Sequence, residues 1–153
     1  MIAIREILVP TDLSEGSAAA FPYARGFAES FHARIVLLAV IEDPARSVLA
    51  GLDSADLWLG RDADSLTAGL LKEAKARLRI LAEKLGTACA ETIAIKGIHA
   101  AREIVRVAGE RGSDLIVLAT HGRTGVAHAL MGSTAERVVR EAPCPVLAVR
   151  VPR

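Results

Sequence analysis

The sequence is most informative between residues 115 and 136, where it reads Leu115-Ile116-Val117-Leu118-Ala119-Thr120-His121-Gly122-Arg123-Thr124-Gly125 and then Met131-Gly132-Ser133-Thr134-Ala135-Glu136. The first five residues form an unbroken apolar run, which predicts a buried strand. The glycines that follow allow the backbone to approach a ligand closely, because no Cβ intervenes. Ser133 and Glu136 have the spacing of a capping box, which predicts that a helix begins at Ser133. The stretch therefore predicts a strand, a glycine-rich loop and a helix, in that order.

The same alternation extends toward both ends of the chain. Four further apolar runs predict strands at Ala3–Val9, which Pro10 is expected to stop, and at Ile35–Val40, Thr92–Ile95 and Val146–Val149. Apolar residues at helical spacing predict four helices. The first begins at Ser14, has a kink at Pro22 and carries an apolar stripe through Phe21 and Phe31, and the second begins at Leu66 and is ended by Gly86. The third ends near Gly112, and the fourth extends from Ser133 to Arg140. Between Glu42 and about Asp64 the periodicity fades, which indicates a long loop with a short helix around Trp58.

Apolar strands that alternate with amphipathic helices are typical of an α/β fold with a parallel sheet covered on both faces. The 153 residues, 52% hydrophobic and 24% charged, fit a single domain over residues 1–153 with one packed core. A net charge of +1 and only one Trp, one Tyr and three Phe argue against a nucleic-acid partner. No apolar run is long enough for a membrane helix, so we expect no membrane partner and a cytoplasmic protein.

In an open parallel sheet, ligands bind beyond the carboxyl ends of the strands. The residues that follow the predicted strands are therefore candidates for a site: Pro10–Asp12, Val40–Asp43, Lys96–His99 and Ala119–Gly125. Free amides at the start of the last helix, next to a glycine-rich loop, form a natural phosphate site. Spacing alone fits this interpretation and a plain strand–loop–helix connection equally well.

Motifs of several enzyme classes are missing from the sequence. It has no Gly-x-x-x-x-Gly-Lys-Ser/Thr loop, no Gly-x-Gly-x-x-Gly fingerprint and no Gly-x-Ser-x-Gly elbow. Its four histidines have no metal-ligand spacing with cysteines or carboxylates, so no protein-held metal and no catalytic residue is predicted. Without a dedicated base or nucleophile, we do not expect an enzyme with fast turnover.

Several motifs together resemble the universal stress protein family. They are Pro10-Thr11-Asp12, then Asp114-Leu115-Ile116-Val117 leading into Thr120-His121-Gly122-Arg123-Thr124-Gly125, then Gly132-Ser133-Thr134-Ala135-Glu136 and Pro143-Cys144-Pro145-Val146-Leu147. The resemblance covers nearly the whole chain. It implies an adenine nucleotide α-hydrolase-like fold, an open five-stranded parallel sheet in strand order 3-2-1-4-5 with helices on both faces. The ATP-binding branch of the family carries Gly, two residues, Gly, nine residues, then Gly and Ser or Thr; Gly122, Gly132 and Ser133 match, and Ala119 replaces the first glycine.

The resemblance also implies a binding role for particular residues. Pro10, Thr11, Asp12 and the backbone of Val40 would flank adenine and ribose. Ala119, Thr120, His121, Gly122, Arg123, Thr124 and Gly125 would wrap the ribose and phosphates, and Gly132, Ser133 and Thr134 would bind phosphate oxygens. From the residues alone, His121 is either a phosphate donor or a structural histidine, Arg123 either a phosphate partner or a solvated charge, and Asp12 either a ligand or a turn residue.

The function implied is a cytoplasmic stress-response protein that binds ATP as a regulatory ligand, with Mg or Mn held mainly by the phosphates and slow hydrolysis at most. Three alternatives stay open: a nucleotide-free dimerisation module, a cAMP-binding signalling module, and a true ATP hydrolase. The resemblance also implies a homodimer. The last predicted strand, Val146–Val149, is an apolar sheet edge that invites pairing with a second copy.

Overall fold

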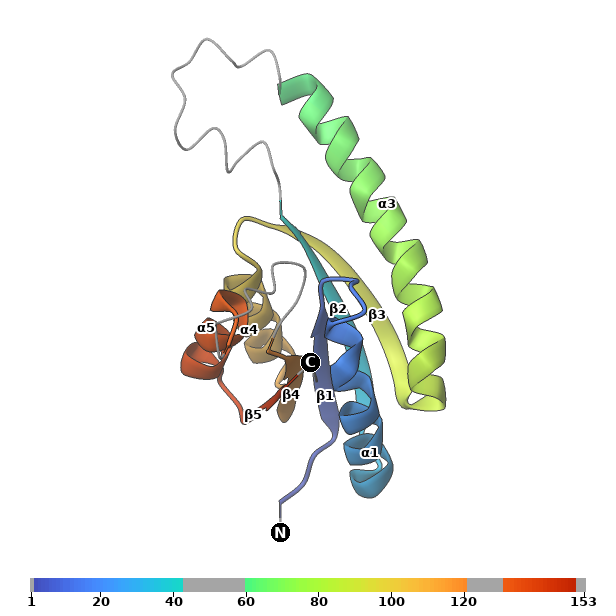
Figure 1. The fold of residues 1–153 in the computed structure, drawn as a ribbon, viewed down its shortest axis with the longest axis vertical. Coiled ribbons are helices and arrows are strands. Elements are labelled where there is room, and N and C mark those ends of the chain that lie inside the picture. The colour runs from blue at the N-terminus through green and yellow to red at the C-terminus, as the bar shows by residue number, and fades with distance from the viewer. Residues whose placement is uncertain (1, 43–59, 121–130, 151–153) are drawn as a thin grey trace.

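The computed structural model describes residues 2–42, 60–120 and 131–150, and in it five parallel strands form one sheet (Figure 1). The strands are β1 (Glu6–Thr11), β2 (Arg34–Glu42), β3 (Cys89–Gly97), β4 (Leu115–Ala119) and β5 (Val146–Val149). Their order across the sheet is β3-β2-β1-β4-β5, which confirms the expected topology. β1 lies in the middle and is buried along its whole length.

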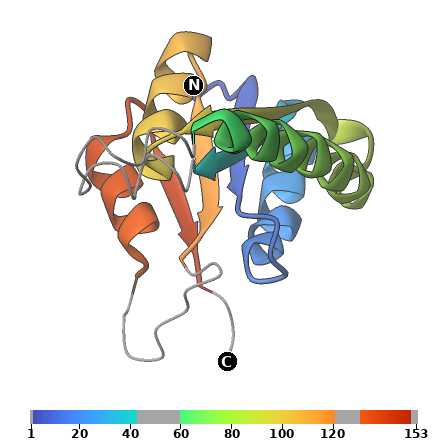
Figure 2. The ribbon, with the colours of Figure 1, turned by 90° about the horizontal axis from the view of Figure 1, so that it is seen from above.

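Helices cover both faces of this sheet, as predicted. α1 (Phe21–Phe31) and α3 (Gly60–Leu85) lie on one face, and α4 (Ala100–Arg111) and α5 (Ser133–Glu141) lie on the other (Figure 2). Successive strand residues point to opposite faces, so Ile7 and Val9 pack with α1 and α3 whereas Leu8 packs with α4 and α5. The long helix α3 ends at Gly86, which has the left-handed φ of 65° expected of a glycine that terminates a helix.

The first strand differs from its prediction at both ends. It begins at Glu6 rather than Ala3 and continues through Pro10 to Thr11. Proline lacks the N–H that a strand donates to its neighbour. Pro10 is tolerated because β1 pairs with β4 only at Ile7 and Leu8, while its pairing with β2 extends to Thr11.

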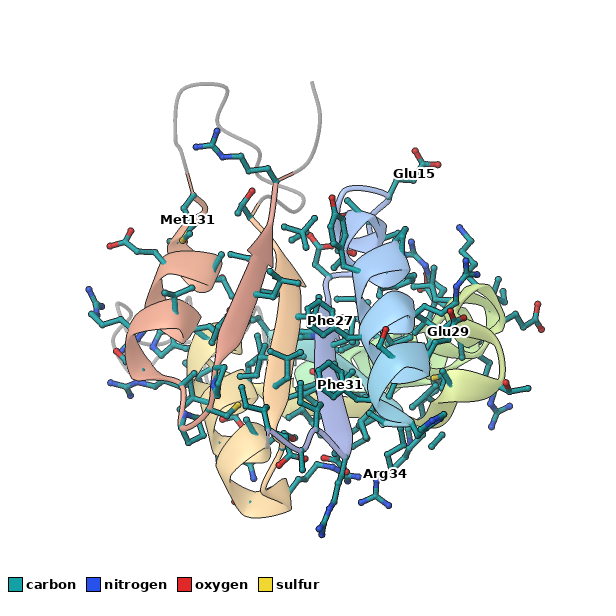
Figure 3. All side chains as sticks on the ribbon, turned by 90° about the horizontal axis from the view of Figure 1, so that it is seen from below. Glu15, Phe27, Glu29, Phe31, Arg34 and Met131 are labelled. Atoms are coloured by element: carbon teal, nitrogen blue, oxygen red, sulfur yellow. The ribbon has the colours of Figure 1, made fainter. Side chains whose placement is uncertain are left out.

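The helix after β1 also begins later than predicted. A short 3-10 helix, η1 (Ser17–Ala20), precedes α1, which starts at Phe21 rather than near Ser14. Pro22 therefore lies in the first turn of α1, where a missing N–H costs nothing, and it does not kink the helix. Phe31, expected in the buried stripe, stacks on Phe27 with ring centroids 6.1 Å apart and stays 39% exposed (Figure 3).

Two other segments are longer than the sequence predicts. α3 already begins at Gly60, so the last residues of the predicted loop are helical, and the short helix predicted around Trp58 lies outside the described residues. β3 extends from Cys89 to Gly97, well beyond Thr92–Ile95, followed by α4 from Ala100. Its added residues are held by a continuous register with β2 from Val36 to Glu42 rather than by apolar content.

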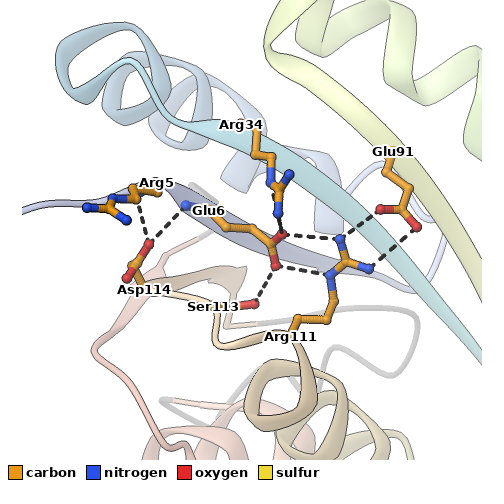
Figure 4. Close-up of polar contacts among 7 residues, drawn as sticks. All are labelled: Arg5, Glu6, Arg34, Glu91, Arg111, Ser113 and Asp114. Atoms are coloured by element: carbon orange, nitrogen blue, oxygen red, sulfur yellow. Dashed lines mark hydrogen bonds and ion pairs between the residues drawn. The ribbon is translucent and has the colours of Figure 1, made fainter.

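A network of charged side chains joins the amino ends of the strands (Figure 4). Glu6 is only 4% exposed, and Arg111 Nε and Nη2 donate to its two carboxylate oxygens at 3.0 and 3.1 Å. Arg34 Nε donates to Oε2 at 3.1 Å and the Ser113 hydroxyl donates to Oε1 at 3.0 Å. Arg111 Nη2 also donates to Glu91 at 2.7 Å. One buried carboxylate thus connects β1, β2 and the end of α4.

The environment of Glu6 favours its ionised form. Burial by itself raises the pKa of this carboxyl, but hydrogen bonds from Arg111 and Ser113, the charge of Arg111 and the hydrogen bond from Arg34 outweigh burial and leave the pKa below its usual 4.5. Asp114 lies beside this network and accepts hydrogen bonds from the backbone N–H groups of Arg5 and Glu6 at 2.7 and 3.0 Å. The Asp114 carboxylate therefore anchors the start of β1.

The two edge strands of the sheet differ in character. β3 carries the exposed charged residues Glu91 and Lys96 along its length. β5 has four apolar residues, of which Val146, Leu147 and Ala148 are half-buried and Val149 is buried.

Candidate functional site

A pocket of about 430 Å³ lies beyond the carboxyl ends of β1, β2 and β4. Figure 3 shows Glu15 and Met131 at this end of the molecule and Arg34 at the opposite end, so the pocket and the Glu6 network occupy opposite ends of the sheet. The volume is in the range of small-molecule sites. Leu38, Ala39, Val40, Leu118 and Ile104 supply apolar walls, against which a flat heterocycle can pack.

The structure brings together every described residue to which the family resemblance assigned a binding role. Lining the pocket are Pro10, Thr11, Asp12, Val40, Ala119, Thr120, Gly132, Ser133 and Thr134. The remaining predicted residues, His121, Gly122, Arg123, Thr124 and Gly125, lie outside the described residues. Lys96–His99, which follow the third predicted strand, were expected in the site but do not line the pocket. Ala100, the first residue of α4, lines it in their place.

The loop after β1 is held by its own side chains. The Thr11 hydroxyl accepts a hydrogen bond from the Leu13 N–H at 3.0 Å and lies 2.7 Å from the Ser17 hydroxyl. Asp12 Oδ1 accepts hydrogen bonds from both the N–H and the hydroxyl of Ser14. Leu13 has a left-handed backbone, with a φ of 67°, which is uncommon for a residue other than glycine. Asp12 is thus a turn residue and a pocket residue at once.

The start of α5 forms the opposite wall. α5 begins at Ser133, as predicted, but its N-cap is Gly132 rather than Ser133, and the Gly132 carbonyl accepts a hydrogen bond from Glu136 N at 2.9 Å. Gly132 N donates to the Thr120 carbonyl at 2.7 Å, so the end of β4 is joined directly to the helix start. Gly132 has an extended backbone, with φ −70° and ψ 152°, and no side chain of the described residues caps the helix, so the first N–H groups of α5 have no side-chain acceptor among them.

This helix start has the properties of an anion site. The first N–H groups of a helix have no partner within the helix, and the helix dipole adds positive potential there. Ser133 and Thr134 are exposed and line the pocket. Their amides and hydroxyls are therefore donors available to a phosphate group.

Helix α3 adds two charged residues that the sequence analysis did not predict. Arg77 and Glu73 line the pocket, although both stand among several other charged residues of α3 in the sequence. Arg77 Nη2 donates to the Leu13 carbonyl at 2.8 Å. The one sequence feature that could have indicated Arg77 is its position on the helix. Arg77 is flanked by Ala74 and Leu78, which are buried in the core, so its side chain projects from α3 beside the sheet.

The part of the chain that the structure describes has neither a cluster of metal ligands nor a helix that could span a membrane. Within residues 2–42, 60–120 and 131–150, no three His, Cys, Asp or Glu side chains are grouped as metal ligands would be. None of the helices described is both long enough and apolar enough to cross a bilayer.

The sequence profile of the Universal stress protein family matches residues 3–150. The chain belongs to the universal stress protein family. Universal stress protein MJ0531 of Methanocaldococcus jannaschii is 35% identical to it, an alignment that covers 97% of this chain and 84% of that protein.

Solved structures of universal stress proteins share the fold. The structure of MJ0577, also from Methanocaldococcus jannaschii, superimposes with a TM-score of 0.83 at 27% identity and covers 99% of both chains. A universal stress protein solved in complex with cAMP superimposes with a TM-score of 0.61 at 23% identity, covering 98% of this chain and 99% of that one. At that identity the second likeness concerns the fold.

Proposed function

We propose that this universal stress protein binds ATP in the pocket as a regulatory ligand. One observation carries the proposal: Gly132 joins the end of β4 to the start of α5, which leaves the Ser133 and Thr134 donors on the wall facing Asp12. The apolar walls suit adenine and the helix start suits phosphates. A universal stress protein of the same fold was solved in complex with cAMP, so an adenine nucleotide is a class of ligand that this fold can accommodate.

A regulatory role is favoured over rapid hydrolysis because the pocket carboxylates near the strand ends are already engaged as acceptors. Asp12 accepts from Ser14, and Glu42 Oε1 accepts from the Ala100 N–H at 2.9 Å. Both carboxylates already support the local structure, and the sequence carries no hydrolase motif that would supply a dedicated base or nucleophile. We therefore propose slow hydrolysis at most, in a cytoplasmic protein of the stress response.

The metal ion of the proposed complex would come with the nucleotide. Magnesium and manganese prefer oxygen ligands and commonly bind through substrate phosphates rather than all-protein cages. The exposed hydroxyls of Ser133 and Thr134 are the pocket groups suited to hold such an ion together with the phosphates. When bound, the ion would neutralise phosphate charge.

The experiment that tests this function is mass spectrometry of nucleotide released from the purified protein, followed by calorimetric titration with ATP, ADP, AMP and cAMP. We expect ATP to bind and an ATPase assay to give a rate far below about 1 per second. A preference for cAMP would support the signalling alternative, and turnover at that rate or above would support an ATP hydrolase. Absence of binding to all four nucleotides would contradict the proposal.

We also propose that the protein is a homodimer paired through β5. The supporting observation is that Val146, Leu147 and Ala148 leave an apolar edge half-buried at the end of the sheet. An edge of this kind is a template for pairing with another chain.

A further inference from the structure

Arg77 connects two segments that lie 64 residues apart in the sequence. Its Nη2 donates to the carbonyl of Leu13 at 2.8 Å. Ala74 and Leu78, on the same turns of α3, are buried in the core with 2% and 0% exposure. The helix backbone at Arg77 is therefore fixed against the sheet, and the guanidinium is presented to the loop from a rigid element.

Leu13 is the strained residue of that loop. Its φ of 67° places it in the left-handed region, and its side chain is 6% exposed. Both of its backbone polar atoms are held by side chains: the N–H donates to Thr11 Oγ1 and the carbonyl accepts from Arg77. A strained conformation persists only where surrounding contacts hold it, and these two contacts do so.

The conformation of Leu13 also determines where its neighbours lie. Ser14 follows directly, and its N–H and hydroxyl both bind Asp12 Oδ1. A change at the Leu13 carbonyl would therefore move Ser14 and turn the Asp12 carboxylate. A chain of contacts therefore connects Arg77 through Leu13 and Ser14 to Asp12.

We propose that Arg77 is a positioning residue for the nucleotide site, in which it orients Asp12 toward the adenosine part of the ligand. The proposal rests on the proposed function. Arg77 reaches the pocket from α3, which covers the face of the sheet opposite α5 (Figure 2). The helix start proposed for the phosphates belongs to α5, so Arg77 approaches from the other side of the site.

The test compares Arg77→Met, which keeps the aliphatic stem and removes the donors, with Arg77→Lys, which restores one donor. The matched control is Arg79→Met, a change at an exposed residue of the same helix. Calorimetry should show that Arg77→Met weakens adenosine and ATP equally, by about tenfold, the size of one lost hydrogen bond to a charged group. Arg77→Lys should recover part of the loss, and Arg79→Met should match the wild-type protein.

A double-mutant cycle separates positioning from a general loss of structure. In the Asp12→Asn background, Arg77→Met should cost much less than in the wild-type background, because both changes act through the same carboxylate. Additive losses would overturn the proposal. A loss confined to ATP, with adenosine unaffected, would also overturn it and would make Arg77 a phosphate contact.

Hydrogen exchange without nucleotide tests the contact independently of the proposed function. The amides of Leu13 and Ser14 should exchange faster in Arg77→Met than in the wild-type protein or Arg79→Met. If the wild-type protein binds neither adenosine nor ATP, the proposed function fails, and unchanged exchange of these two amides would separately overturn the role of Arg77 in holding the loop.

Discussion

Gly132 serves the fold and the proposed site at once. Its amide and carbonyl connect the end of β4 to the first turn of α5. A Cβ at this position would lie 3.0 Å from the Thr120 carbonyl oxygen, closer than ordinary van der Waals contact. The backbone of Gly132 is in a region that any residue adopts, so what requires glycine here is space and not conformation.

Gly132→Val should therefore weaken ATP binding by about tenfold or more, because the helix start must move away from Thr120 and its amides lose their aim at the phosphates. Isothermal titration of the folded variant measures the loss. The matched control is Gly26→Val, since a Cβ on Gly26 meets nothing within 4 Å. An unchanged affinity in a folded Gly132→Val protein would remove α5 from the proposed site.

At the scale of elements, β1 is the strand on which both ends of the sheet depend. Its first residue, Glu6, accepts hydrogen bonds from Arg34 of β2 and Arg111 of α4, and the loop after its last residue carries Asp12. The charged network and the pocket are thus separated by the length of one strand. We expect stability and nucleotide affinity to respond separately to changes at the two ends.

Glu6→Gln should destabilise the protein by about 2 kcal/mol at pH 7, because Arg111 and Arg34 lose their shared carboxylate. Most of this comes from Arg111, since the Arg34 side chain is 63% exposed and screened by water. Urea unfolding measures the difference. Glu110→Gln, at an exposed carboxylate paired with Arg106, is the control and should cost only a few tenths of a kcal/mol.

The destabilisation should depend on pH in one direction. The folded-state pKa of Glu6 lies below the usual value of 4.5, so the ionised carboxylate contributes its full stabilisation above that pH. The contribution disappears as pH falls through the folded-state pKa. The stability difference between wild-type and Glu6→Gln proteins should therefore be constant well above pH 4.5 and shrink as the pH falls below that value, and a difference that did not shrink on acidification would contradict this account.

The elements that the sequence predicted well have apolar patterns that only one structure satisfies. Ile35–Val40 and Leu115–Ala119 are unbroken apolar runs, and both are buried strands. β3 was predicted too short because the charged residues Glu91 and Lys96 flank the predicted run and are held in the strand by backbone pairing with β2, so the apolar pattern stops before the strand does. The predicted kink at Pro22 was wrong because the helix begins at Phe21 and not near Ser14. Sequence periodicity locates a helix start only to within a few residues, and the effect of a proline depends on that start.

The candidate site was predictable where it follows a motif and unpredictable where it depends on distant contacts. Asp12 and Gly132 stand in short motifs, and both line the pocket. Arg77 belongs to no motif. It lies beside Leu13, 64 residues earlier in the sequence, because α3 packs on the sheet. Asp114 belongs to a motif of the family, yet the structure places it at the start of β1, away from the pocket, so its motif reflects the fold.

At the scale of the whole molecule, the proposed dimer makes a prediction at β5. Leu147 is half-buried and packs against the core, and Leu147→Lys should put an unpaired charge into the proposed interface or the core beside it and give a folded monomer. Light scattering at low micromolar concentration measures the mass, and circular dichroism confirms the fold. Val139→Lys is the control, because Val139 is 46% exposed on α5. A folded Leu147→Lys protein that stays dimeric would place the interface elsewhere.

The contrast between the two sheet edges has a consequence for how far such pairing can extend. An edge that accepts any neighbour would allow copies to add one after another into a filament, which is the hazard of open sheets. Here the β3 edge carries Glu91 and Lys96, whose charges would need to be desolvated by an incoming strand, whereas β5 is apolar. Two copies that meet through β5 about a two-fold axis would leave to the solvent the β3 edges, which carry a charge on each side of a central apolar segment. In the proposed dimer, assembly would then stop at two copies, and the pair would be closed against further growth.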